Sequence, residues 1–116
     1  MSNQLHRSRQ LAFDRQGGKC YYCGISILVT GTGHPRLRCT VEHLVPRSEG
    51  GSDLPDNIVA ACAHCNHTRH KRRSPPAPEA YRLEVRKRVQ RGRWHAPWVF
   101  RSGLLKGGRA VRMPAT

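Results

Sequence analysis

The chain has 116 residues, a formal net charge of +14 from 21 Lys and Arg against 7 Asp and Glu, and a hydrophobic fraction of only 37%. A chain of this length forms one small core, so we expect a cross-link or a bound metal to supplement its packing. Its apolar runs are far shorter than the roughly 20 residues of a membrane span, and residues 1–15 lack the apolar stretch of a signal peptide, which predicts a cytoplasmic protein with no membrane partner.

The first half of the chain contains three segments with recognisable local patterns. Residues 5–16 carry apolar side chains at helical spacing, and the Gly-Gly pair that follows predicts the end of this helix. Residues 25–30 and 37–45 are rich in β-forming side chains and are predicted to pair as a hairpin. Residues 47–57 contain two glycines, a proline and several other turn formers, which predicts a loop.

The second half of the chain begins with a short predicted strand at residues 57–61. Helices are predicted at 63–73 and 79–91, and a Ser-Pro-Pro sequence ends the first of them. Beyond these helices the chain has no clear periodicity, but Trp94 and Trp98 provide apolar side chains that can anchor the tail on the domain.

Positive charge is concentrated towards the C-terminus. Residues 1–68 carry a net charge of +2, whereas residues 69–116 carry fourteen Lys and Arg against two Asp and Glu. A polyanion is the expected partner, and nucleic acid is the most common one; a membrane-surface helix would need a broader apolar face. We therefore divide the chain into a domain at 1–74 and a basic helix and tail at 75–116, which contact nucleic acid or a protein partner.

Four of the five cysteines form two Cys-x2-Cys pairs separated by 38 residues. They are Cys20, Cys23, Cys62 and Cys65. Two residues between thiolates let one turn direct both sulfurs at a tetrahedral ion, so the four predict a structural Zn²⁺ site. Two disulfides are the alternative, which the odd cysteine count and the missing secretory signal disfavour. Cys39 is predicted to be a buried apolar side chain, and His64 a solvated neighbour of the zinc ligands.

Between and after the cysteine pairs stands a second set of polar and turn-forming residues. It comprises Glu42, His43, Pro46, Gly50, Gly51, Asn57 and Asn66. In this order, together with the cysteines, the sequence closely resembles the zinc-stabilised HNH nuclease motif from Cys20 to about Lys71. The resemblance implies an α+β fold of the ββα-metal (His-Me finger) type, with added helices. In such a fold two strands and a helix hold a catalytic divalent ion, beside a separate structural zinc bound by the four cysteines.

Hydrolysis of a phosphodiester needs a deprotonated water and a metal that neutralises developing charge. Histidine has an ordinary pKa that suits a general base near neutral pH, and the resemblance implies this role for His43. It also implies that Asn57 hydrogen-bonds the loop and positions His43. Glu42 and Asn66 are the implied oxygen ligands of the catalytic ion.

A third ligand is predicted on the same helix as Asn66. His70 lies four residues further on, on the same helical face, whereas His67 is less well placed. This ligand set suits Mg²⁺ or Mn²⁺, and the imidazole would also admit Zn²⁺ or Ni²⁺. Regular alternation puts Glu42 and His43 on opposite faces of their strand. Both serve one site only if the strand bends or ends there.

Five cations near the motif are predicted to contact DNA phosphates. They are Arg47, Arg69, Lys71, Arg72 and Arg73. The function that follows is a divalent-metal-dependent DNA endonuclease, without a small-molecule cofactor, that nicks or cuts duplex DNA with low intrinsic sequence specificity. The alternatives are a non-catalytic, zinc-organised nucleic-acid-binding module and an accessory protein of phage packaging or assembly. A homodimer and a protein partner docked on the tail both stay open.

Overall fold

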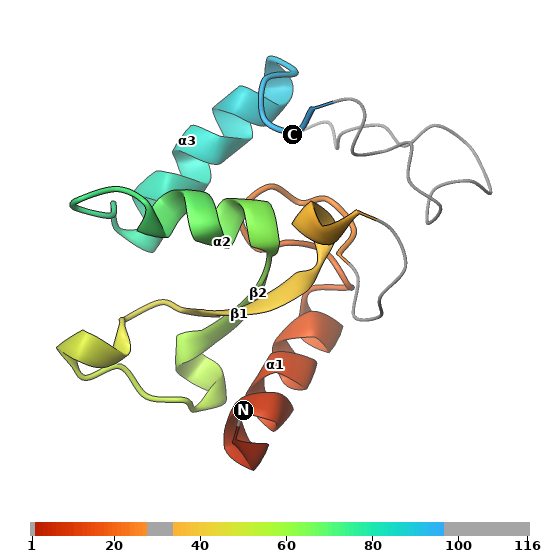
Figure 1. Cartoon of the computed structure of the whole chain (residues 1–116). Helices are drawn as coiled ribbons and strands as arrows, with labels where there is room; N and C mark the ends of the chain where they lie inside the picture. The colour runs from red at the N-terminus through yellow and green to blue at the C-terminus, as the bar shows by residue number, and fades with distance from the viewer. Residues whose placement is uncertain (1, 28–33, 97–116) are drawn as a thin grey trace.

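The structure is a computed structural model that describes residues 2–27 and 34–96. Its elements in chain order are α1 (Asn3–Arg15), η1 (Pro35–Leu37), β1 (Cys39–His43), η2 (Arg47–Glu49), η3 (Pro55–Asn57), β2 (Ile58–Cys62), α2 (Ala63–His70) and α3 (Pro78–Gln90). The two strands form an antiparallel sheet with α1 on one side and α2 and α3 on the other (Figure 1). The predicted α+β class is confirmed. Among the described residues, none of the helices has both the length and the apolar character that a membrane crossing requires.

The sheet pairs β1 with β2, in a register that aligns Cys39 with Cys62. Residues 25–27 do not pair with β1 as the predicted hairpin requires, and residues 28–30 of that hairpin lie outside the described residues. In the described part of that segment, Ile27 N donates instead to Gly18 O at 2.9 Å. Residues 25–27 thus close the loop around the first cysteine pair, through Gly18 and through a bridge between Lys19 and Ser26.

Helix α1 is fixed at both ends by side-chain hydrogen bonds. Ser2 Oγ accepts from Leu5 N at 3.0 Å and caps the first turn. The helix ends at the predicted Gly-Gly pair, where Gly17 has a φ of +65°. The Gln16 amide then pairs with both backbone groups of Ala60, at 2.8 and 3.0 Å. Gln16 thus satisfies the polar groups of β2 as a neighbouring strand would, and holds α1 against the sheet.

Helix α2 ends at His70, three residues before the predicted end at Arg73. Prolines in the following segment disfavour helical geometry in the residues before them. Pro76 O also accepts a hydrogen bond from Arg69 Nε at 3.0 Å, which holds the chain against α2 after it turns. Helix α3 then begins at Pro78, in the first turn, where a missing N–H carries no penalty.

A single hydrophobic core joins the sheet, the cysteine loops and the helices. Its members from α3 are Tyr81, Val85 and Val89, which are buried in the same cluster as the four paired cysteines and Tyr22. Helix α3 therefore contributes side chains to the core of the unit predicted to precede it, and the division at residue 74 stays a prediction. Trp98 lies outside the described residues.

Candidate functional site

The four paired cysteines converge where the loop around Cys20 and Cys23 meets the start of α2. Their sulfurs are buried and lie within 4.8 Å of one another. Such separations fit tetrahedral coordination of Zn²⁺ by thiolates with Zn–S bonds of about 2.3 Å. All four positions are filled by protein ligands, as in zinc sites that stabilise a fold. The arrangement thus indicates structural zinc binding, as the sequence predicts.

Cys39 is buried as predicted, whereas His64 lies in a different environment from the predicted one. Cys39 is buried outside the cluster, and burial raises the pKa of its thiol, which suits the predicted apolar role. His64 is not solvated as predicted. Its ring is half-buried, 4.8 Å from the ring of Trp94 and 5.1 Å from that of His95, and burial lowers its pKa. The chain after α3 therefore packs back on the zinc site.

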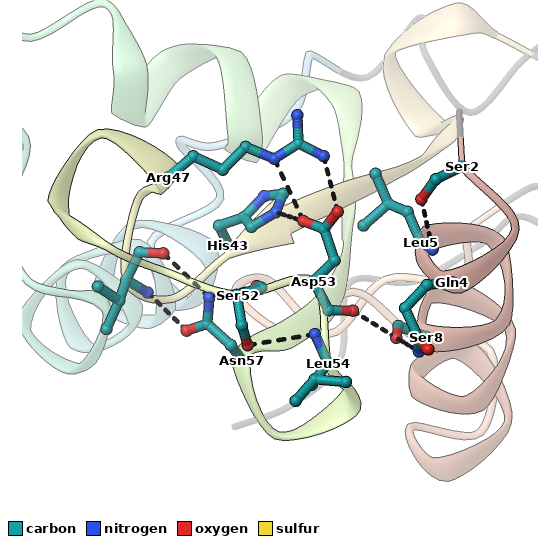
Figure 2. A network of polar contacts seen from close by, with 11 residues as sticks. Ser2, Gln4, Leu5, Ser8, His43, Arg47, Ser52, Asp53, Leu54 and Asn57 are labelled. Atoms are coloured by element: carbon teal, nitrogen blue, oxygen red, sulfur yellow. Dashed lines mark hydrogen bonds and ion pairs between the residues drawn. The ribbon is translucent and has the colours of Figure 1, made fainter.

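His43 is the last residue of β1 and meets a carboxylate from the loop between the strands (Figure 2). Its Nε2 lies 2.8 Å from Asp53 Oδ1, and Arg47 donates to both oxygens of the same carboxylate, at 3.2 and 3.1 Å. The hydrogen bond from His43, with those from Arg47, lowers the pKa of Asp53. Ser8 of α1 donates to Asp53 O at 2.6 Å and ties the loop to the helix. Asp53 is not among the predicted site residues, because nothing in the local sequence marks it as a partner of His43.

The loop that carries Asp53 is held by Asn57. Its Oδ1 accepts from Val45 N at 2.8 Å, and its Nδ2 donates to Val45 O at 3.0 Å and to Ser52 O at 2.8 Å. Gly51 is required at this crossing, because a Cβ there would lie 1.7 Å from Val45 O. The Asn57 side chain thus lies where a loop-positioning residue would have to lie. The close approach of Val45 O explains why the second glycine of the Gly-Gly pair has no side chain.

Glu42 precedes His43 in β1, but its side chain lies on the opposite face, against α2. The carboxylate is 2% exposed and has three polar partners, each at 2.9 Å: Tyr22 Oη, an Arg69 guanidinium nitrogen and His70 Nε2. Burial, with the nearby negative charge, raises the pKa of Tyr22, so its hydroxyl is a neutral donor. Because a buried carboxylate needs compensation, Arg69 is the partner that makes this placement stable.

The residues predicted to hold a catalytic ion are brought to one face of β1. Glu42 Oε1 and His70 Nε2 are 2.9 Å apart, close to the roughly 3 Å between neighbouring ligands on a six-coordinate ion with bonds of about 2.1 Å. Asn66 lies on the same face, with its Nδ2 donating to Thr40 Oγ1 and Val41 O, each at 2.9 Å. Glu42 and His70 therefore fit two positions on a divalent cation, while the amide nitrogen of Asn66 is engaged with β1.

Glu42 and His43 project from opposite faces of β1 near its end. As alternation predicts, Glu42 contacts α2 while His43 contacts the loop held by α1. The strand ends at His43, and Leu44 N then donates to Asn57 O at 2.9 Å as the chain enters the loop. The strand thus ends at His43, but the side chains of Glu42 and His43 lie on opposite faces of it, so their use by one site stays a prediction.

Three of the five cations predicted to contact DNA are paired with acids. The pairs are Arg47 with Asp53, Arg69 with Glu42, and Arg72 with Glu84. The Arg69 side chain is 4% exposed, which contradicts its predicted place on a phosphate-facing surface, because it neutralises a buried carboxylate instead. Lys71 and Arg73 are exposed at the end of α2.

A basic groove of about 200 Å³ lies between η1 and α2. Its polar lining residues are Arg36, Arg38, His64, His67, Thr68 and Lys71, and none of the described residues that line it is Asp or Glu. Burial is the main cause of the lowered pKa of His64, and the positive charges of Arg36 and Lys71 lower it further. Arg36 and Arg38 were not predicted site residues, because they precede β1 in the sequence and line one groove with Lys71 only in the folded chain.

Among protein-family models, one described as HNH endonuclease matches residues 20–72. The matched span begins at the first cysteine of the zinc site and ends just after α2, so it contains the sheet and excludes α1 and α3. The match confirms the resemblance seen in the sequence and indicates nuclease activity in general. No curated protein matches the chain.

Proposed function

Residues 20–72 match the HNH endonuclease family, and on this premise we propose that the protein is a divalent-metal-dependent endonuclease that hydrolyses phosphodiester bonds of DNA with low intrinsic sequence specificity. The observation that carries the proposal is the contact between His43 and Asp53 at the end of β1, 2.8 Å between Nε2 and Oδ1. A histidine oriented by an ionised carboxylate at a strand end is suited to accept a proton from water.

In this proposal Asp53 determines which nitrogen of His43 acts. The lowered pKa of Asp53 keeps it ionised near neutral pH, so Nε2 carries a proton and donates to the carboxylate. Nδ1 is then the nitrogen that accepts a proton from the attacking water. The imidazolium that results gains stabilisation from Asp53, which makes Asp53 a positioning residue and His43 the catalytic base.

Glu42 and His70, with Asn66 beside them, are the residues that would hold the catalytic ion on the other face of β1. When bound, a divalent ion offsets the charge that develops on the phosphate and the leaving oxygen. We place the scissile phosphate at the end of β1, beside His43.

Three features support DNA as the polymer that is cut. The net charge is +14, the groove between η1 and α2 is lined by cations without a carboxylate in the described residues, and Lys71 of that groove and Arg73 are both exposed. Duplex DNA carries closely spaced phosphates, so such a surface binds it without reading its sequence. The low specificity in the proposal follows from this.

A plasmid nicking assay with Mg²⁺ or Mn²⁺ tests the proposal. Wild type should convert supercoiled to nicked DNA, EDTA should stop the reaction, and His43→Ala should lower the rate by about 10²–10⁴-fold, the usual contribution of a general base. His6→Ala, which removes an exposed histidine of α1, is the matched control and should cut like wild type. Cleavage by folded His43→Ala at the wild-type rate would overturn the assignment.

One observation favours a second candidate, a zinc-organised nucleic-acid-binding module without catalysis. The Glu42 carboxylate is buried and already has three polar partners, including the ion pair with Arg69. If the wild-type protein binds DNA with a normal fold and bound zinc but does not nick it at any Mg²⁺ or Mn²⁺ concentration, this second function replaces the first.

A further inference from the structure

Two side chains from the segment after α3 direct ring nitrogens at the zinc-site sulfurs. Trp94 Nε1 lies 3.1 Å from Cys65 Sγ, and His95 Nε2 lies 3.4 Å from Cys23 Sγ. The indole N–H can only donate a hydrogen bond, so Trp94 is a donor to the sulfur and not a metal ligand. His95 is 6% exposed, so this contact is enclosed by protein.

The backbone supplies the same kind of contact to the other two sulfurs. Cys62 N donates to Cys20 Sγ at 3.2 Å, and Cys65 N donates to Cys62 Sγ at 3.4 Å. Each of the four sulfurs therefore lies within hydrogen-bond distance of at least one nitrogen. For Cys20 and Cys62 this is a backbone nitrogen, and for Cys65 and Cys23 it is a ring nitrogen of Trp94 or His95. The family match ends at residue 72, so the second pair of contacts comes from outside it.

We propose that Trp94 and His95 are hydrogen-bond donors to the zinc-bound thiolates and that they slow the release of zinc. Four thiolates on one Zn²⁺ leave two net negative charges inside a buried cluster. Donors to charged sulfur offset that charge, and charge-assisted hydrogen bonds are about twice as strong as neutral ones. The contact between His95 Nε2 and the Cys23 thiolate is attractive when Nε2 carries a proton.

Helix α3 holds this segment in place. The Tyr81 hydroxyl donates to Cys65 O at 2.7 Å, so α3 is attached to the same cysteine that Trp94 contacts. At the end of α3, Gly92 has a φ of +67°, and Arg93 N donates to Arg88 O at 2.9 Å. This turn sends the chain back over the zinc site, where the ring of His64 packs against Trp94 and His95.

Zinc release from the full chain tests the proposal without any need for nuclease activity. The zinc-loaded protein is mixed with excess chelator, and the rate of zinc loss is followed with a metal-binding dye. Trp94→Phe keeps a ring in the core and removes the N–H. Loss of such a partner typically lowers metal affinity about 10- to 100-fold, and zinc release should be faster by up to the same factor. His95→Leu should act in the same direction, and His95→Gln, which restores a donor, should recover part of the loss.

Tyr81→Phe is the matched control, because it removes a buried hydrogen bond to Cys65 that does not involve sulfur. It should lower stability but leave the thiolate-to-metal charge-transfer bands of the Co²⁺-substituted protein unchanged, whereas Trp94→Phe should shift them. Two results would overturn the proposal: zinc release by Trp94→Phe at the wild-type rate, or equal acceleration and equal spectra in Trp94→Phe and Tyr81→Phe.

Discussion

Arg69 and Glu42 form an ion pair at 2.9 Å, with side chains that are only 4% and 2% exposed. The pair joins α2 to the face of β1 that lies behind His43. In an interior of low dielectric each charge depends on the other, so the pair fixes the position of α2 relative to the candidate catalytic strand.

Removal of one member of this pair should be strongly destabilising. Arg69→Met leaves the Glu42 charge buried without its partner, and we expect a loss of about 3–5 kcal/mol in the free energy of unfolding. Arg72→Ala, which breaks the more exposed pair with Glu84, should cost less than about 1 kcal/mol. Urea unfolding of the zinc-loaded proteins measures both. The combination of Arg69→Met with Glu42→Gln should recover part of the loss, and a wild-type midpoint for Arg69→Met would contradict the role of the pair.

Asp53 should contribute stability that depends on pH. Its pKa is lowered in the folded protein from an ordinary value of 3.8. The contribution is therefore fully present above about pH 4 and is lost as pH falls through the lower folded value. Asp53→Asn should have a lower urea midpoint than wild type at pH 7, and the difference should vanish at the acid end. The measured quantity is the difference between the two midpoints, because acid displaces zinc from both proteins alike. A difference that is the same at every pH would show that the carboxylate charge is not its cause.

Zinc binding should be required for folding, and it should need four of the five cysteines. Thiolate-bound zinc contributes on the order of 10 kcal/mol in small zinc-finger peptides, so Cys62→Ala should bind no zinc and lose its near-ultraviolet circular dichroism. Cys39→Ala, which replaces a buried cysteine outside the cluster, should keep one zinc per chain. Metal analysis after dialysis gives the stoichiometry, and one zinc retained by Cys62→Ala would exclude the four-cysteine site.

Truncation should locate the end of the folding unit. A chain of residues 1–74 lacks the buried side chains of α3, each worth about 1.5–3 kcal/mol of burial, and should not fold even with zinc. A chain of residues 1–96 retains α3, Trp94 and His95, and should unfold cooperatively. A folded, zinc-containing 1–74 fragment would instead restore the division predicted from the sequence.

The groove between η1 and α2 should contribute to DNA affinity through charge. Each phosphate contact contributes about −0.9 to the slope of log affinity against log salt concentration for duplex DNA. Arg36→Ala with Arg38→Ala, and Lys71→Ala alone, should weaken binding and flatten this slope. Arg72→Ala is the control, because its guanidinium is paired with Glu84. If Arg72→Ala flattens the slope more than Lys71→Ala does, the groove is not the binding surface.

The zinc ligands and the motif around His43 were predictable because they depend on short spacings. Two residues between cysteines suffice to direct both sulfurs at one ion, and Pro46 with the Gly-Gly pair marks a loop whatever the rest of the chain does. Helices α1 and α3 were predicted to within a few residues for the same reason, since their ends are set by local residues such as Gly17 and Pro78.

Partner choice across the chain was decided by the tertiary structure. The strand of His43 pairs with β2, whereas Ile27, in the described part of the predicted partner segment, bonds to Gly18. Asp53 meets His43 through a loop held by Asn57. Arg69 turns inward because a buried Glu42 needs a counter-charge. The sequence by itself determined which chemical groups the protein contains and where its local turns lie. Only the tertiary structure decided which charges are compensated, because burial depends on residues distant in the chain.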